Sequence, residues 1–179
     1  MQISIDKYFI YFFYLKLKAM LTDFNPLPEN ARIWIYQADR SFTPEEMVEI
    51  RNELDTFLRD WTAHGSNLQA SFELRYKRFI IIGLDQSQAS ASGCSIDASV
   101  RFIQHLEKKY DVQLLDKMNV SYKQGEYIAY KPLSEFKKMA KQKAVSKNTI
   151  VFNNLVNTKM EYEEHWEVPA SESWHGRFM

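Results

Sequence analysis

The chain has 179 residues with a formal net charge of zero, 45% hydrophobic residues and 26% charged residues, the balance of an ordinary soluble globular domain. Zero net charge excludes an overall basic field that would attract nucleic acid, and an equally strong acidic field. A single cysteine excludes an intrachain disulfide, so a cytoplasmic location is expected.

The first nineteen residues contain an apolar run of eight residues, Tyr8–Leu15. A membrane-spanning helix needs about 20 apolar residues, so no transmembrane segment is predicted. Asp6 and Lys7 precede the run and no small-residue cleavage pattern follows it, which does not fit a signal peptide. Met20 is a candidate start, and residues 1–19 are interpreted as a start-site artefact or a disordered extension. The alternative is a peripheral membrane anchor.

Residues 31–38 (ARIWIYQA) are predicted to form a strand buried on both faces, because apolar side chains occupy both alternating sets. The segment SFTPEEMVEIRNELDTFLRDWTAHG follows and has apolar residues at helical spacing as far as Trp61. Thr43 is its predicted N-cap, Pro44 fits the first helical position, and Glu46 completes a capping box. Gly65 is predicted to end this helix.

Two strands, 70–76 and 78–85, are separated by too few residues for anything but a tight hairpin. A second helix is predicted from about residue 96 to 110, after a loop rich in serine and alanine. Residues 117–123 and 126–131 flank Gln124-Gly125 and indicate another hairpin. A short helix within 132–145 and a strand at 149–156 follow.

The order of elements through residue 123 is β-α-β-β-α-β. A ferredoxin-like antiparallel sandwich, with two helices on one face of a four-stranded sheet, satisfies this order. We therefore predict an α+β fold with a ferredoxin-like core at 20–123. Residues 124–179 are predicted to form a C-terminal β-α-β extension or a small appendage packed on the core.

Several motifs of nucleotide and metal sites are missing from the sequence. No G-x-x-x-x-G-K-[ST] occurs, and backbone N–H groups of such a loop are what wrap phosphates in a conventional nucleotide hydrolase. No H-x-H, H-E-x-x-H or C-x-x-C occurs either, so no zinc site is indicated. We predict no cofactor and no metal.

Cys94 is the sharpest candidate for chemistry. It is predicted at a helix N-terminus, where the helix dipole favours a thiolate. In the predicted topology, the end of the first helix and the start of the second lie at the same end of the sheet, which places His64 near Cys94. Cysteine with histidine is the minimum pair for an activated thiolate. The alternative is that Cys94 only fills space at a helix end.

The serines around Cys94 indicate a second hypothesis. Ser92 and Ser95 hydroxyls, together with N–H groups at the helix start, would suit a phosphate or sulfate ion. The alternative is ordinary helix capping by Ser95.

The predicted third helix has a basic face. The usual interpretation is a solvated face. Pairing with the acidic residues of the tail is the alternative, and no nucleic-acid role is expected. The four lysines are Lys137, Lys138, Lys141 and Lys143, and the acids are Glu161, Glu163, Glu164 and Glu167.

Four segments carry a resemblance to a known family: WIYQADRSFTPEE, RYKRFIIIGLDQSQASASGCSID, FNNLVNTKMEYEEHW and ESWHGRF. Together they resemble a family of uncharacterised bacterial proteins often labelled "ABC transporter ATPase", from about residue 20 to the end. The label implies a nucleotide-binding role in transport, although Walker A is missing and SGCSID is not the LSGGQ signature. In addition, residues 130–152 are similar to the GYF-2 type of interaction module, which implies peptide or protein binding by the C-terminal third.

Three functional hypotheses follow. The first is a binding or adaptor module without enzymatic activity, whose protein partner binds the C-terminal third. The second is a thiol-dependent enzyme or redox-responsive protein that uses Cys94 with His64. The third, from the family label, is a nucleotide-binding accessory of a transporter. The sequence does not indicate an oligomeric state.

Overall fold

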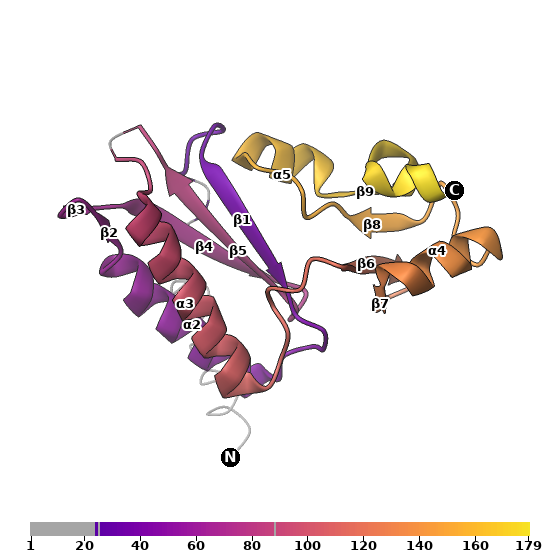
Figure 1. The fold of residues 1–179 in the computed structure, drawn as a ribbon, viewed down its shortest axis with the longest axis horizontal. Coiled ribbons are helices and arrows are strands. Elements are labelled where there is room, and N and C mark those ends of the chain that lie inside the picture. Colours follow the sequence, from indigo (N-terminus) through magenta and orange to yellow (C-terminus); the bar gives the residue numbers. More distant parts are fainter. Residues whose placement is uncertain (1–23, 25, 88) are drawn as a thin grey trace, which may run out of the picture.

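The computed structural model describes residue 24, residues 26–87 and residues 89–179 (Figure 1). This part of the chain is α+β, with helices packed on antiparallel sheets, as predicted. None of its helices combines the length and the apolar character needed to cross a membrane. The predictions made for residues 1–19 lie outside the described residues.

The first region is a three-stranded sheet covered by two long helices. Its strands are β1 (Arg32–Gln37), β4 (Gln69–Arg75) and β5 (Phe79–Asp85), in the order β1-β5-β4 and antiparallel throughout. The helices are α2 (Pro44–Arg59) and α3 (Gly93–Tyr110). Apolar side chains of both helices share one core with alternate residues of β5.

Helix α2 begins as predicted. The Thr43 side chain accepts a hydrogen bond from the Glu46 backbone, the Glu46 side chain accepts one from the Thr43 backbone, and Pro44 opens the helix. The prediction that Gly65 ends it is wrong, because α2 ends at Arg59. Residues 62–67 form a small hairpin instead, with β2 (Thr62–Ala63), β3 (Ser66–Asn67) and a turn in which His64 and Gly65 have positive φ.

The second region contains a four-stranded sheet in the order β7-β6-β8-β9. Its strands are β6 (Asn119–Gln124), β7 (Tyr127–Pro132), β8 (Ile150–Phe152) and β9 (Glu167–Pro169). The other elements are α4 (Leu133–Lys141), α5 (Lys159–His165) and two 3₁₀ helices, η1 (Ala170–Glu172) and η2 (Trp174–Phe178). The β6–β7 hairpin is confirmed, with Gly125 at positive φ in its turn. The predicted strand 149–156 is shorter, because β8 ends at Phe152.

The prediction that residues 117–123 form the fourth strand of the first sheet is wrong. These residues become β6, which pairs with β7 and β8 in the second sheet. The physical reason is packing: Val120 and Tyr122 point into a separate core with Phe136 and Val151. In a ferredoxin-like sandwich the fourth strand would lie beside the first. Among the described residues, the outer edge of β1 therefore has no neighbouring strand, apart from an isolated bridge between Arg32 and Thr158.

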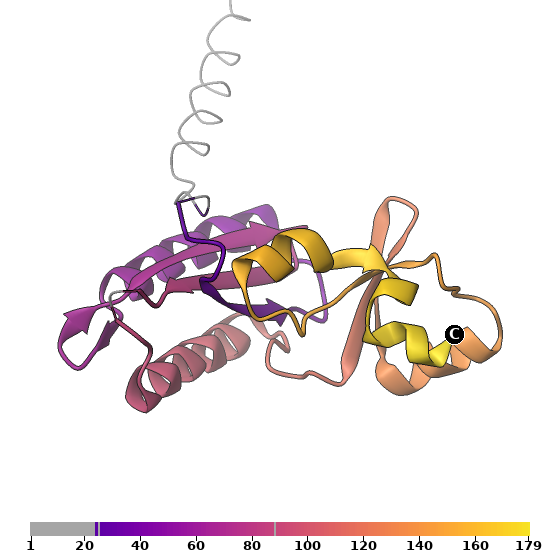
Figure 2. The same ribbon diagram turned by 90° about the horizontal axis from the view of Figure 1, so that it is seen from above.

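A third core joins the two regions. It lies on the face of the first sheet opposite α2 and α3, where α5 and its flanks cover Ile33, Phe79 and Ile81. In Figure 2, α5 lies in front of the strands of the first sheet. Phe79 contacts Phe152 and Trp166, with ring centroids 4.7 and 5.1 Å away. The C-terminal segment is therefore an integral part of the packing of the first sheet.

Candidate functional site

The outer edge of β1 is the first feature of the site. Since Ala38 N–H donates to Arg78 O across the β1–β5 pair, the even-numbered residues of β1 face β5 and the odd-numbered ones face outward. Ile33 N–H donates outward to Asn157 O, at 2.8 Å. Within the described residues, no hydrogen bond involves the backbone N–H or C=O of Ile35.

A groove of about 310 Å³ follows this edge. We call it the edge groove. Part of β1 forms its floor, α3 and the loop before β6 form one wall, and the loop after β8 forms the other. The side chains that line the groove include Trp34, Ile35, Tyr36, Gln37, Ile96, Val100, Leu115 and Leu155. Leu155 is 59% exposed, an unusually open position for a large apolar side chain.

Buried amide side chains fix the inner end of the groove. Gln37, only 4% exposed, donates through Nε2 to Asn119 O at 3.0 Å. Its Oε1 accepts from Asn154 Nδ2 at 2.8 Å, and Asn154 Oδ1 accepts from Trp166 Nε1 at 2.9 Å. This chain of hydrogen bonds joins β1 to the start of β6 and to the loop after β8, so the two walls of the groove are held at a fixed separation.

The lining is mostly apolar, with several neutral amide side chains and few charges. The Arg32 guanidinium lies over the Trp34 ring, 4.5 Å from its centroid. Burial raises the pKa of Tyr36 to about 12, so its phenol stays neutral at physiological pH. Charge is present only where Asp116 and Lys117 border the groove. Such a site offers backbone hydrogen bonds and apolar contact.

The predicted thiol site lies elsewhere, at the start of α3. Cys94 and His64 line one hollow of about 630 Å³, together with Asp60 and Trp61. Cys94 is exposed, so the alternative that it only fills space at a helix end does not hold. Among the described residues, no hydrogen bond joins Cys94 to His64. Whether the thiol is reactive stays a prediction.

The predicted anion site uses hydroxyls that are already engaged. Ser92 is the N-cap of α3, and its Oγ accepts from Ser95 N–H at 3.2 Å. Ser95 is buried and its Oγ donates to Ser92 O at 2.9 Å. Capping therefore comes from Ser92, and the prediction that Ser95 is the cap is wrong.

The three other histidines of the chain each have a different environment. His105 contacts Glu53 and His165 lies near Glu164. His175 is fully buried and stacks on Trp174. The predicted pairing of the third helix with the acidic tail is not found in the described part of the chain, where Glu167 binds Lys123 of β6 instead.

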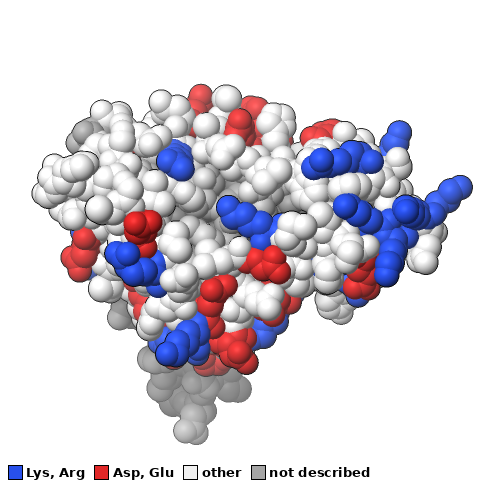
Figure 3. All heavy atoms as spheres, in the orientation of Figure 1, with Lys and Arg blue, Asp and Glu red and all other residues white. Residues whose placement is uncertain are grey.

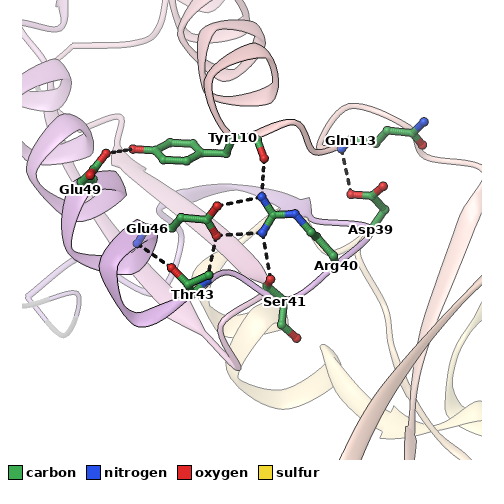
Figure 4. Close-up of polar contacts among 8 residues, drawn as sticks. All are labelled: Asp39, Arg40, Ser41, Thr43, Glu46, Glu49, Tyr110 and Gln113. Atoms are coloured by element: carbon green, nitrogen blue, oxygen red, sulfur yellow. Dashed lines mark hydrogen bonds and ion pairs between the residues drawn. The ribbon is translucent and has the colours of Figure 1, made fainter.

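Sequence reasoning missed a polar network between α2 and α3, shown in Figure 4. Arg40 binds both carboxylate oxygens of Glu46, each at 2.8 Å, and also donates to Tyr110 O at the end of α3. The Arg40 guanidinium is the main reason that the pKa of Glu46 lies below its usual range. Because Glu46 is also the capping-box residue, this network holds the two helices together and has a structural role.

No set of histidine, cysteine and acidic residues in the described ranges could hold a metal ion. No protein-family model matches the chain, no curated protein is significantly similar to it, and no solved structure matches it. The resemblance to the family labelled "ABC transporter ATPase" therefore stays a prediction, and the edge groove must be interpreted from its own geometry. No local pattern in the sequence indicates this groove, because it arises where β6 joins the second sheet instead of the first.

Proposed function

We propose that the chain is a protein-binding module that takes an extended segment of another protein into the edge groove, as an added strand beside β1. The observation that carries this proposal is the backbone of Ile35 at the edge of β1, which has no hydrogen-bond partner among the described residues and is bordered by largely apolar walls. Adding a strand to an open sheet edge is a common mode of peptide recognition: the backbone gives affinity and alternate side chains give specificity.

The geometry sets the length of the segment. The open run from Trp34 to Gln37 spans roughly 13 Å at about 3.3 Å per residue, room for about four residues of an added strand. Side chains of that strand would alternate between the α3 wall, with Ile96 and Val100, and the wall with Leu155. We therefore expect a ligand with apolar residues at alternate positions.

The walls also favour a single strand over a second copy of the chain. Two β1 edges could pair only if each also fitted between the α3 wall and the Asn154–Asn157 loop of the other copy. One extended segment meets no such restriction, and edges left open without protection invite non-specific pairing. The walls around Ile35 are consistent with selective access.

The test removes one edge donor without disturbing the sheet. In Ile35→Pro the outward N–H is lost, while the β1–β5 hydrogen bonds come from the neighbouring residues. Ile35→Ala is the matched control, since it keeps the N–H and truncates the side chain. Peptides are selected on the wild-type protein from a random twelve-residue phage library, and their binding to each variant is measured by calorimetry.

We expect selected peptides with alternating apolar residues. Their affinity should fall at least about tenfold in Ile35→Pro and much less in Ile35→Ala. Bound peptide should also slow amide exchange at Ile35 and Gln37. The proposal fails if no peptide is enriched, or if binding is equal in the two variants.

Two other occupants give distinct results. A second copy would make the mass measured by light scattering depend on concentration, and Ile35→Pro would abolish that dependence. Occupation by the chain's own N-terminal residues would make Ile35 exchange faster when residues 1–19 are removed. Either result would replace the proposal.

A second candidate function is supported by the hollow that Cys94 and His64 share. Here the exposed thiol would act as a nucleophile, with His64 as the base that activates it. The test compares iodoacetamide alkylation at neutral pH in the native protein, in His64→Ala and in the urea-unfolded chain. Faster reaction in the native protein than in the other two would support it, and equal rates would reduce Cys94 to an ordinary surface thiol.

A further inference from the structure

One end of the second region carries a dense group of lysines. Residues 130–148 contain six lysines and a single acid, Glu135, in a chain whose net charge is zero. Lys131 pairs with Glu135 at 2.8 Å, and Lys137 lies over the Phe178 ring at 4.8 Å. The other four have no ion pair with any described residue. They are Lys138, Lys141, Lys143 and Lys147, all exposed, and we call them with Lys137 the lysine face (Figure 3).

The lysine face borders an apolar hollow. The hollow has a volume of about 360 Å³ and is lined by Met118, Leu133 and Ser134. Lys137, Lys138 and Lys141 of α4 complete its lining. Met118 is 65% exposed, a high value for a large apolar side chain. Apolar atoms bordered by lysines that have no ion pair with a described residue suit one apolar side chain whose neighbours are carboxylates.

The hollow and the edge groove are neighbours along the chain. Asp116, Lys117 and Asn119 line the groove, while Met118 lines the hollow. Met118 O also accepts from Leu133 N–H at 2.9 Å, which ties the loop to the start of α4. An extended chain advances about 3.3 Å per residue, so a segment that leaves the groove at this end needs only a few residues to reach the lysine face.

We infer that the partner's segment carries acidic residues beside its apolar stretch, and that these bind the lysine face with one apolar side chain seated on Met118 and Leu133. This inference rests on the proposed function, because the same segment fills the edge groove. It identifies the partner's class as a protein with an extended apolar motif flanked by aspartate or glutamate.

Charge alone would also attract nucleic acid or an anionic membrane, but the composition of this surface favours an acidic protein segment. The residues lining the hollow include neither an arginine nor an aromatic ring, which are the groups that bind phosphates bidentately and stack on bases. Insertion into a membrane would need an apolar helix face, and Phe136 of α4 is fully buried in the protein's own core.

The experiment uses the full chain and a defined probe. A fluorescein-labelled peptide of eight aspartate and glutamate residues around one central leucine is titrated and followed by anisotropy. The variants are Lys138→Ala/Lys141→Ala and, as the control of equal charge, Arg101→Ala/Lys108→Ala, two exposed positions on α3. A second peptide replaces the leucine by serine. Vesicles of phosphatidylcholine with 20% phosphatidylserine and a twelve-nucleotide single-stranded DNA serve as the other probes.

We expect the leucine-containing peptide to bind, with roughly five- to tenfold weaker affinity for Lys138→Ala/Lys141→Ala and little change in the α3 control. The serine peptide should bind more weakly than the leucine peptide, and added salt should weaken both. The inference is overturned if the peptide does not bind, if both double variants lose affinity equally, or if vesicles or DNA bind more tightly than the peptide.

The two proposals fail separately. Ile35→Pro lies outside the lysine face, so it should leave binding of the acidic probe unchanged. If Ile35→Pro has no effect on the selected peptides while the acidic probe still requires Lys138 and Lys141, the groove proposal fails and the lysine face stands as an independent site. If instead Ile35→Pro weakens the selected peptides but the acidic probe does not require Lys138 and Lys141, the groove proposal stands. Only the acidic residues are then removed from the description of the partner.

Discussion

The two regions of the molecule have different means of holding their cores together. The first region has helices of 16 and 18 residues that close over its sheet. The second has helices of nine and seven residues, and its core is completed by the C-terminal tail. Four buried polar atoms of the second region find no hydrogen-bond partner among the described residues, against two in the first region. They are Ser121 Oγ, Tyr130 Oη, Trp174 Nε1 and His175 Nε2 in the second, and Ser71 Oγ and Arg78 Nε in the first.

Such atoms are expensive to bury, since each lost hydrogen bond costs about 1–3 kcal/mol. The second region is therefore expected to be the less stable one, and to depend on the shared core with the first. Three changes test this difference, and we take them in order of expected effect.

The largest effect is expected where the regions meet. Phe79→Ala should lower the free energy of unfolding by about 3–5 kcal/mol, because it leaves a cavity beside Phe152 and Trp166. Amide exchange should rise more in β8 and β9 than in α2 and α3. The control is Leu54→Ala, a buried change inside the first region. Equal loss of protection everywhere in Phe79→Ala would mean that the two regions unfold as one unit.

The next effect is a dependence on acid. Burial lowers the pKa of His175 to about 4, with a smaller contribution from Arg177. The unfolded chain, with a histidine pKa near 6.5, then binds a proton that the folded protein excludes. Stability should consequently fall by up to about 3 kcal/mol as the pH drops from 6.5 towards 4.

Urea unfolding at several pH values measures this loss. His175→Phe should flatten the dependence between pH 6.5 and about 5.5, where few carboxylates change their protonation. Trp174→Phe changes the same packing without removing a titratable group, so it should keep the dependence. An unchanged slope in His175→Phe would assign the acid sensitivity to another group.

The smallest effect compares two equivalent helix starts. Thr43 of α2 and Thr158 of α5 each form a capping box, with Glu46 and Glu161. Replacing either by alanine should cost about 1 kcal/mol. In Thr158→Ala, amide hydrogen exchange should rise in the second region only. Thr43→Ala should instead lower the free energy of unfolding of the whole protein. If Thr158→Ala proves the more costly globally, the order of stability is reversed.

Local signals in the sequence predicted much of the fold. The start of α2 could be recognised because Thr43, Pro44 and Glu46 act within one helical turn. Its end could not, because Trp61 leaves the helix to pack in the core and donate from Nε1 to Ser95 O, 34 residues away. The helical spacing of Trp61 was therefore misleading, and Gly65 serves a hairpin turn instead.

Local sequence patterns could not predict which of the two sheets each strand joins. The β6 segment has the pattern of a half-buried strand in either sheet, and only its contacts with Phe136 and Val151 decide between them. The edge groove follows from that decision, so it could not be predicted either. The shared hollow of Cys94 and His64 follows from helix directions in the first region, which the sequence did predict.

Because β1 lies between two cores, its sequence is expected to tolerate insertions and deletions poorly. Ile33 and Ile35 pack in the core shared with α5, while Trp34 and Tyr36 pack beneath α2 and α3. Successive side chains of a strand point to opposite faces, so losing one residue would exchange these two sets. Two aromatic rings would enter the space of two aliphatic side chains, and the aliphatic side chains would be left in the larger space of the rings. A one-codon deletion in this strand would thus be far more damaging than most single substitutions, and length changes should be confined to the loops on either side of it.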